Sequence, residues 1–488
     1  MVTDPSVVSA VPIIEWFMDD AVYDDLKANH RFDNVEGDAV IAYNGTVYDG
    51  VKMRIRGNVS RSYEKNSWKV EMPDGYLFDM PGLLHEPVDE FALQRDWWPL
   101  ARLGWDIAAA AGQPEIDWIS VRQQRNGEFH GVGAYLEVTD GRWRDRNGFD
   151  DDGDSFYKID FSRMTPYSSE EDARTSSGLD KKEGDPNDYS DIYELTRGVA
   201  LNGSAQLAFL RDNLDVPQVI NYLAVISIIR HVDSRGQNYR IARDGETGRW
   251  ELILWDFDWI LHGEDAEAEK GERWAFSTAE FSGNDLYESI FDHPELEELF
   301  NRRVKTLRDD VLGNDELVDD YVATVNSMLP EYALEAQRWD FNPGTTWRTN
   351  QTRNRVEFLR DEFDDHTAPF GEIPQAQPAS PNIEISYVEF DPTDGSDAEY
   401  IELTNLESTA IDLSNWSLDT AVDVTFTPGT VIGGGDTVVF AKDDVTFKAS
   451  HGNGQYIGGY FSGKLSNDGE LLRLLNDTGT VVDQTNFG

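Results

Sequence analysis

Apolar and polar residues alternate over short segments in the first third of the chain. Alternation in segments rich in β-branched and aromatic residues predicts strands, here at Ala39–Tyr43, Val47–Arg56 and Trp68–Met72. An apolar run at Pro99–Ala111, followed by a glycine and a proline, predicts a helix with a defined end. The dipeptide Asn126-Gly127 favours a tight turn and predicts a β-hairpin between residues 116–123 and 131–138.

The middle of the chain sets a polar stretch beside a strongly apolar one. Residues 160–215 are dense in Ser, Asp and Glu, and we expect an insertion or a substrate-facing lobe edge that is irregular and partly mobile. Residues Val216–Arg230 are apolar on nearly every side, which indicates a buried helix. Two strands follow at Tyr239–Arg243 and Trp250–Leu254, and amphipathic helices are expected from Leu286 to about Asp364.

The last part of the chain has a different texture. Residues 367–381 contain four prolines among Ala, Gln and Ser, which is the composition of a linker. Beyond them, short strands separated by Gly, Asn and Asp turns are typical of a β-sandwich. We therefore expect an α+β domain over residues 1–366, a linker over 367–381 and an all-β domain over 382–488.

The composition supports folded domains and excludes several kinds of site. The 488 residues include 14 Trp, and aromatics make up 12% of the chain, enough for two or three packed cores. No apolar run approaches the ~20 residues of a membrane span. The apolar stretch Val7–Ile14 lacks a basic leader, so we expect either a mature form or a protein that is not exported. The absence of cysteine excludes disulfides, thiol nucleophiles and cysteine zinc sites.

The net charge of -50 is the strongest feature of the composition. A surface this acidic repels phosphate, which argues against DNA or RNA as a partner. Only 12 of the 42 basic residues are lysine. Lysine-poor, acidic surfaces suit high salt, where screening reduces self-repulsion, so we favour a halophilic or marine source. A medium rich in divalent cations and an ordinary acidic surface that keeps the protein soluble are the alternatives.

The sharpest local motif combines His231–Asn238 with Trp255–Asp258. The first segment has the spacing His-x-Asp-x₄-Asn, and the second reads Trp-Asp-Phe-Asp. Phosphoryl transfer needs a carboxylate near the acceptor hydroxyl and oxygen ligands for Mg²⁺. A loop with this spacing, followed at hairpin distance by a second Asp, provides all of them. The alternative is that Asp233 and Asn238 only cap a helix and a turn.

The stretch from His231 to Asp258 resembles the core of the CotH kinase family, whose members resemble highly divergent protein kinases. The resemblance covers roughly residues 10 to 365. It implies a bilobal, protein-kinase-like fold and ATP- and Mg²⁺-dependent phosphorylation of Ser or Thr, with Mn²⁺ as a possible substitute. By position, Asp233 matches the catalytic aspartate, while Asn238, Asp256 and in addition Asp258 match metal ligands.

The N-terminal region resembles the same family. Arg56, Gly57 and Asn58 begin a segment similar to its Arg-Gly-x-x-Ser signature, and Lys65 and Lys69 lie in the Lys-x-Ser-Trp-Lys part. The resemblance implies that these five residues bind the nucleotide. Gly57 permits close approach of the backbone, and the three cations can meet triphosphate oxygens. A polar hairpin with solvated cations is the alternative.

Two further residues concern the nucleotide. Glu137 follows a segment similar to the family's Asn-Gly-x-x-x-Gly turn, which places it near the adenine-binding edge, although a packed hairpin explains it equally well. Protein kinases pair the strand lysine with a helical glutamate. The helix at Pro99–Ala111 has no Glu, and its only acid is Asp106. Either Asp106 substitutes or the lysine is held differently.

The acidic run at residues 150–154 invites a structural Ca²⁺ site. It lacks the spacing of a full EF-hand loop and the glutamate that completes one, so a solvated acidic loop is favoured over Ca²⁺.

Residues 382–488 resemble the lamin-tail domain, an immunoglobulin-like sandwich. The similarity lies in four stretches, at residues 383–386, 399–405, 411–418 and 465–470. Alternation places Ile401 and Leu403 on one inward face, and Trp416 is the expected core anchor. The resemblance implies an accessory role in attachment to a surface or polymer.

Three hypotheses of function follow. The favoured one is an active kinase that phosphorylates a secreted, coat or surface protein, with an extracellular or cell-surface location implied by the family. The second is a catalytically inactive, kinase-like scaffold of the surface or coat. The third, motivated by charge alone, is a calcium-dependent adhesin.

Overall fold

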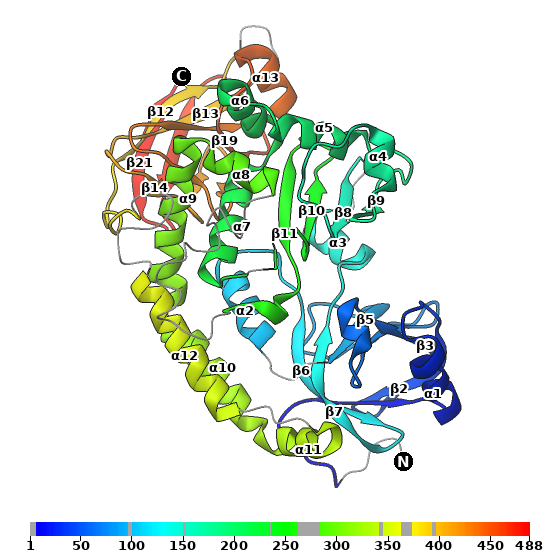
Figure 1. Cartoon of the computed structure of the whole chain (residues 1–488). Coiled ribbons are helices and arrows are strands. Elements are labelled where there is room, and N and C mark those ends of the chain that lie inside the picture. Colours follow the sequence, from blue (N-terminus) through cyan, green and yellow to red (C-terminus); the bar gives the residue numbers. More distant parts are fainter. Residues whose placement is uncertain are drawn as a thin grey trace. The chain divides into compact units, whose positions relative to one another are not determined.

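The computed structural model divides the chain into two compact units (Figure 1). The first unit contains residues 1–106, 115–148 and 315–354, and the second contains residues 107–114, 149–314 and 355–488. The structure describes residues 6–95, 100–149, 153–231, 233–234, 236–261, 284–340, 345–362, 373–392 and 397–488. The second unit thus joins the middle of the chain to the whole C-terminal domain.

The first unit is built on a closed barrel of seven strands. Its order is β1-β2-β3-β4-β5-β7-β6, and it closes because β1 pairs in parallel with β6. The strands are β1 (Ile13–Phe17), β2 (Gly37–Tyr43), β3 (Thr46–Arg56), β4 (Ser67–Glu71), β5 (Glu90–Arg95), β6 (Trp118–Arg125) and β7 (Glu128–Leu136). All the strands predicted for this region are therefore present.

Alternating side chains fill the barrel with aromatic rings. Trp16 and Trp68 are fully buried with ring centroids 5.4 Å apart, and Phe78 and Phe91 stack at 4.5 Å. The predicted hairpin is confirmed as β6 and β7. Its two-residue turn needs positive φ at both central positions, and Asn126 and Gly127 have φ of 51° and 84°.

The helices assigned wholly or partly to the first unit are mostly amphipathic. They are α1 (Asp20–Asn29), α2 (Leu100–Ala110), α3 (Gly141–Asn147), α10 (Asp315–Ser327), α11 (Leu329–Trp339) and α12 (Thr345–Glu362). Helix α11 packs on β7, where the Trp339 indole donates to the carbonyl of His130 at 2.8 Å. The helix predicted at Pro99–Ala111 is confirmed as α2.

A four-stranded antiparallel sheet lies at the centre of the first part of the second unit (Figure 1). Its order is β11-β10-β8-β9. The strands are β8 (Ser155–Ile159), β9 (Leu179–Glu183), β10 (Tyr239–Arg243) and β11 (Trp250–Leu254). The bounds of β10 and β11 are those predicted from sequence. In the pairing, Tyr239 lies opposite Leu254, and Arg243 lies opposite Trp250.

Helix α7 (Val216–Ile228) runs beside this sheet and is buried along its whole length, as predicted. It begins at Asp215, whose side chain accepts from the amide of Gln218 at 3.0 Å. Further helices follow in the region predicted to be helical: α8 (Asp285–Phe291), α9 (Pro294–Leu307) and then α10 to α12.

The prediction of an irregular region at residues 160–215 is wrong. The region forms α4 (Glu170–Thr175), strand β9, α5 (Ser190–Val199) and α6 (Gly203–Asn213). Many of its polar residues begin helices: the Ser169 side chain, for example, accepts from the amide of Asp172 at 3.1 Å. The polar composition therefore reflects caps and turns between short elements.

The C-terminal domain has two four-stranded sheets, of order β12-β13-β18-β19 and β16-β15-β20-β21, and a small pair β14-β17. Their strands are β12 (Ile383–Glu389), β13 (Tyr400–Asn405), β14 (Ile411–Asp412), β15 (Ser417–Asp419), β16 (Val424–Thr425), β17 (Val431–Ile432), β18 (Thr437–Ala441), β19 (Ile457–Tyr460), β20 (Glu470–Leu475) and β21 (Val481–Phe487). Helix α13 (Asp444–His451) lies between β18 and β19 along the chain. Ile401, Leu403 and Trp416 are buried, as predicted.

Of the predicted linker, residues 367–372 lie outside the described residues. Residues 373–381 have neither helix nor strand, yet they belong to the second unit and pack within it. Ile373 is buried, and the carbonyl of Gln375 accepts from Arg302 at 2.8 Å.

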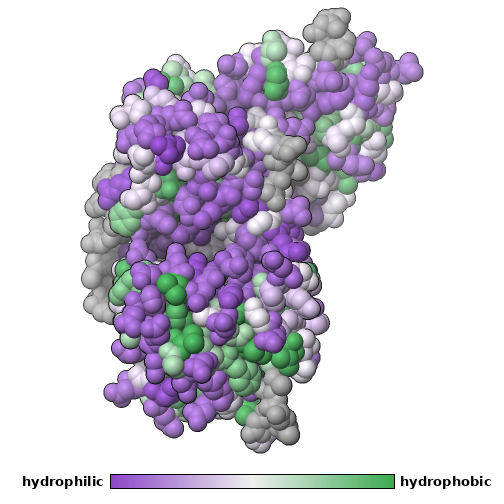
Figure 2. Space-filling view, turned by 90° about the vertical axis from the view of Figure 1, so that its right-hand side faces the viewer, coloured by the Kyte–Doolittle hydropathy of each residue, from purple (hydrophilic) through white to green (hydrophobic). Residues whose placement is uncertain are grey.

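Hydrophilic residues dominate the face of the molecule seen in Figure 2, in keeping with the net charge of -50. Within the described part of the chain, none of the helices combines the length and apolarity needed to cross a membrane.

Candidate functional site

The loop after α7 is attached to the segment after β11 through His231. The buried Nε2 of His231 lies 3.1 Å from the carbonyl oxygen of Trp255 and 3.0 Å from that of Asp256. Carbonyl oxygens only accept, so Nε2 carries a proton. Burial lowers the pKa of His231, although the negative charges of Asp256 and Asp233 act to raise it. The imidazole ring is therefore neutral at pH 7.

Asp233 and Asn238, predicted to act together, are in direct contact. The amide of Asn238 donates to Oδ2 of Asp233 at 3.2 Å, and Gln237 donates to Oδ1 at 2.8 Å. Asn238 has φ of 58°, a left-handed conformation that asparagine tolerates better than most residues. The loop thus holds one carboxylate with two amide donors, and both predicted side chains are only partly buried.

Asp256 comes to the same end of the sheet through strand pairing. Because Tyr239 lies opposite Leu254, the residues just before β10 and just after β11 are neighbours. Asp256 has φ of 62° and begins a short 3₁₀ turn, Phe257–Trp259. A left-handed conformation at a residue other than glycine costs free energy and is common at functional sites. Asp258 lies in the turn and is exposed.

The side-chain oxygens at this end of the sheet have the chemistry that Mg²⁺ prefers in its ligands. Among the described residues, no group of three or more His, Asp or Glu side chains could hold a metal ion. Mg²⁺ does not need such a cage, because it is usually bound by one or two carboxylates together with water and substrate phosphates. The oxygens of Asn238 and Asp256 are ligands of the required chemistry, and both side chains are partly exposed.

In the first unit, Gly57 makes a turn that strongly favours glycine. Its φ is 104°, and an added Cβ would lie 1.8 Å from the Oγ of Ser60. Arg56 is the last residue of β3 and lies opposite Ser67 on β4. Asn58 is exposed and precedes a 3₁₀ turn.

Lys65 has an acidic partner that the sequence did not indicate. Its Nζ lies 2.5 Å from Oε1 of Glu335 on α11, and both side chains are buried. The same ammonium donates to the carbonyl of Val132 on β7, whose amide donates to Oε2 of Glu335 at 2.8 Å. Asp106, the partner considered from sequence, instead lies 3.4 Å from Arg102.

Lys69 is the more accessible of the two lysines. It lies on β4 and forms ion pairs with Glu90 and, at 3.4 Å, with Glu71. Its side chain is 21% exposed, whereas that of Lys65 is 1% exposed. A phosphate can therefore reach Lys69 more easily than Lys65.

Glu137 is held by the protein itself. Its buried carboxylate accepts from Arg146 at 2.6 and 2.9 Å and from the amide of Asp117 at 3.0 Å. Burial acts to lower the pKa of Arg146, but its hydrogen bonds with Glu137 and the charge of that carboxylate raise it above its ordinary value. These contacts account for Glu137 without a ligand.

Residues 150–152 of the acidic run, which we expect to form a solvated loop rather than a Ca²⁺ site, lie outside the described residues. Asp154 is buried, and its carboxylate accepts from the amide of Gly245 at 2.7 Å, which joins two turns.

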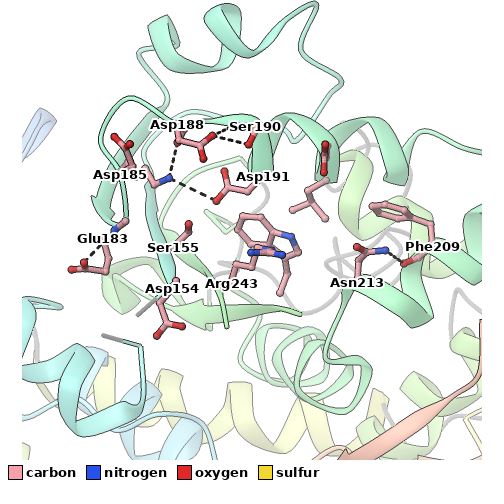
Figure 3. A pocket seen from close by; sticks show the side chains of 16 residues that line it. Asp154, Ser155, Glu183, Asp185, Asp188, Ser190, Asp191, Phe209, Asn213 and Arg243 are labelled. Atoms are coloured by element: carbon pink, nitrogen blue, oxygen red, sulfur yellow. Dashed lines mark hydrogen bonds and ion pairs between the residues drawn. The ribbon is translucent and has the colours of Figure 1, made fainter. Parts of the chain in front are cut away.

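A cavity of about 570 Å³ opens at the other end of the central sheet (Figure 3). Ser155, Arg243 and Trp250, which lie opposite one another on β8, β10 and β11, form part of its wall. Asp188 and Asp191 on its rim are engaged with Ser190 and Tyr157. None of the site residues predicted from sequence lines this cavity.

Comparisons with known proteins agree with the motifs. The model of the CotH kinase protein family matches residues 53–366, and that of the Lamin Tail Domain matches residues 376–488. The inner spore coat protein H of Bacillus subtilis (strain 168) is 25% identical over 331 residues, which cover 64% of this chain and 87% of that protein. The resemblance drawn from the motifs is thereby confirmed. The chain belongs to the CotH kinase protein family and carries a C-terminal lamin-tail domain.

Proposed function

We propose that the protein is a kinase that transfers the γ-phosphate of ATP to Ser or Thr of a protein substrate, with Mg²⁺ or Mn²⁺. The observation that carries the proposal is the contact between Asp233 and Asn238, joined through His231 to the segment of Asp256. The set combines a carboxylate base with two oxygen ligands for a metal, and phosphoryl transfer needs both. Membership of the CotH family supports the reaction class and a bilobal, kinase-like fold.

Each residue of the loop has a role in this proposal. Asp233 orients the acceptor hydroxyl and accepts its proton as the hydroxyl oxygen attacks the γ-phosphorus and ADP leaves. Asn238 and Asp256 would hold the metal, with the exposed Asp258 as a further ligand. When bound, Mg²⁺ neutralises charge on the phosphate oxygens. His231 ties the segment of Asp256 to the loop of Asp233 and takes no part in proton transfer.

Phosphate contacts are proposed for Arg56, Lys69 and the turn at Gly57 and Asn58. Lys65 is already engaged with Glu335 and Val132. Its side chain is also only 1% exposed, so we assign it first to holding β7 against α11. The adenine-binding role considered for Glu137 is not needed to explain that residue.

The similarity to a spore coat protein supports a surface or coat location and a coat or surface protein as substrate. The lamin-tail domain is the proposed attachment module, and a scaffold without activity is the alternative.

The proposal is tested by incubating the protein with γ-labelled ATP and Mg²⁺ or Mn²⁺, alone and with a generic Ser/Thr acceptor. We expect label on protein that is lost in Asp233→Ala. Glu246→Ala is the matched control, because Glu246 is an exposed acid in the turn at the far end of the β10–β11 hairpin. Equal labelling in all three proteins, or none in the wild type, would favour the scaffold.

A further inference from the structure

Both elements that lead to the candidate catalytic residues are attached to the lamin-tail domain. Helix α7 ends at Ile228, just before His231 and Asp233, and strand β11 ends at Leu254, just before Asp256. Each is joined by a buried arginine to an aspartate of the domain. All of these contacts lie within the second unit.

The first connection, the Arg303 bridge, consists of Arg303, Asn221 and Asp412. Arg303 on α9 donates from Nε to Oδ1 of Asn221 on α7 at 2.9 Å, and from Nη1 to Oδ2 of Asp412 on β14 at 3.0 Å. Its third nitrogen donates to the carbonyl of Ala111 at 3.0 Å, which also accepts from Asn221. The Arg303 and Asp412 side chains are 5% and 2% exposed, so one guanidinium ties α7 to the domain in a dry setting.

The second connection, the Arg249 bridge, consists of Arg249, Asp444 and Tyr460. Arg249 directly precedes β11, and its Nη2 donates to Oδ1 of Asp444 at 2.9 Å. Tyr460 donates to the same oxygen at 2.7 Å, and Arg249 also donates to the carbonyl of Leu214 at 2.8 Å. Lys448 pairs with the other oxygen of this carboxylate at 2.6 Å. Burial alone would raise the pKa of Asp444, but the charge of Arg249 and the hydrogen bonds from Lys448, Tyr460 and Arg249 lower it, so the carboxylate is ionised.

These bridges indicate a lamin-tail domain that is packed into the second unit, rather than one that is joined to it only by a linker. Exposed ion pairs contribute little, whereas removing one member of a buried pair leaves an uncompensated charge. Further contacts surround the bridges: Arg302 donates to the carbonyl of Ala410 at 2.7 Å, and Glu298 accepts from the amide of Gly434 at 3.1 Å. A domain serving only as an anchor would need neither buried charges nor contacts with α7 and β11.

We infer that Asp412 and Asp444 are positioning residues, through which the lamin-tail domain holds α7 and β11 in the register that brings Asp233, Asn238 and Asp256 together. The inference rests on the proposed kinase function. Asp412 acts through α7 on the loop of the base, and Asp444 acts through β11 on the metal-binding aspartate. Loss of the Arg303 bridge and loss of the Arg249 bridge therefore change different kinetic constants.

The test uses the full chain with Asp412→Asn and Asp444→Asn, which keep side-chain shape and remove charge. We expect Asp412→Asn to lower kcat about tenfold with an unchanged KM for Mg·ATP, and Asp444→Asn to raise that KM. Asp412→Glu, which keeps the charge, is expected to retain part of the rate that Asp412→Asn loses. Asp419→Asn is the control for loss of an ion pair inside the domain, since its partly exposed pair with Arg473, at 2.6 Å, lies wholly within the domain. Unchanged kcat and KM in folded Asp412→Asn and Asp444→Asn proteins would overturn the inference.

Hydrogen exchange separates this inference from the proposed function. The amides of the last turn of α7 and of β11 should exchange faster in Asp412→Asn and Asp444→Asn respectively, and unchanged exchange would overturn the inference even in an inactive protein. Absence of phosphate transfer by the wild type, with faster exchange in the variants, would reject the kinase and the catalytic part of the inference, and leave only the mechanical coupling.

Discussion

Lys65 and Glu335 form a fully buried ion pair, 2.5 Å apart in space and 270 residues apart along the chain. Glu335 also accepts from the amide of Val132, so one carboxylate holds the lysine and the backbone of β7. Protein kinases hold their strand lysine with a glutamate from a nearby helix. In this protein a glutamate from α11, far along the chain, forms the ion pair with Lys65.

Glu335→Ala should destabilise the protein by about 3–5 kcal/mol, because it leaves the Lys65 ammonium buried without its countercharge. Urea unfolding followed by tryptophan fluorescence measures this, with Asp38→Ala as the control. Asp38 pairs with Lys52 on the surface, where solvent screens the pair, so its loss should lower the free energy of unfolding far less. Similar losses of unfolding free energy in the two variants would show that the buried ion pair contributes no more to stability than a surface pair.

Asp256→Ala should weaken Mg·ATP binding more than Asp233→Ala does. The metal and its nucleotide depend on Asp256, whereas Asp233 acts on the acceptor hydroxyl. A tenfold weaker Kd, equal to about 1.4 kcal/mol, is expected for Asp256→Ala in a calorimetric titration. Equal losses in the two variants would contradict this division of roles.

Glu251→Gln should stabilise the protein at pH 8 by several degrees in Tm and have little effect near pH 4. Burial, together with the charges of Asp215, Asp244 and Asp154, raises the pKa of Glu251 to about 8. Between about pH 4.3 and pH 8 the folded state keeps a proton that the unfolded state releases, so stability falls as pH rises. Melting curves at both pH values test this, with the exposed Glu246→Gln as control. The prediction fails if the two variants behave alike.

Thermal stability should rise from low to molar salt. The net charge of -50 repels itself at low salt, and the screening length shortens from about 10 Å at 0.1 M to about 3 Å at 1 M. A melting temperature that stays flat across this range would remove the halophilic interpretation.

Local signals predicted the elements that carry the candidate site. Strands β10 and β11 are short, largely apolar segments on either side of a glycine turn, and α7 is apolar on nearly every side, so their bounds could be read from short windows. The candidate residues at their ends came from motif spacing, and the contact between Asp233 and Asn238 agrees with that spacing.

Long-range pairings gave no local signal. Glu335 sits in an ordinary amphipathic helix, and nothing near it in sequence marks its partner. Barrel closure depends on the parallel pairing of β1 with β6, and the Arg303 bridge joins residues 109 apart. At residues 160–215, the polar capping residues obscured the few apolar positions of α5. The sequence therefore did not indicate the three helices and the strand that this region contains.

The central claim is tested most directly by measuring, in one reaction, the ADP released and the phosphoserine and phosphothreonine formed. With ATP and Mg²⁺, we expect stoichiometric formation of the two in the wild type, and loss of both in Asp233→Ala with the fold retained. ATP consumed without phosphorylated Ser or Thr, or equal yields from the two proteins, would contradict the account.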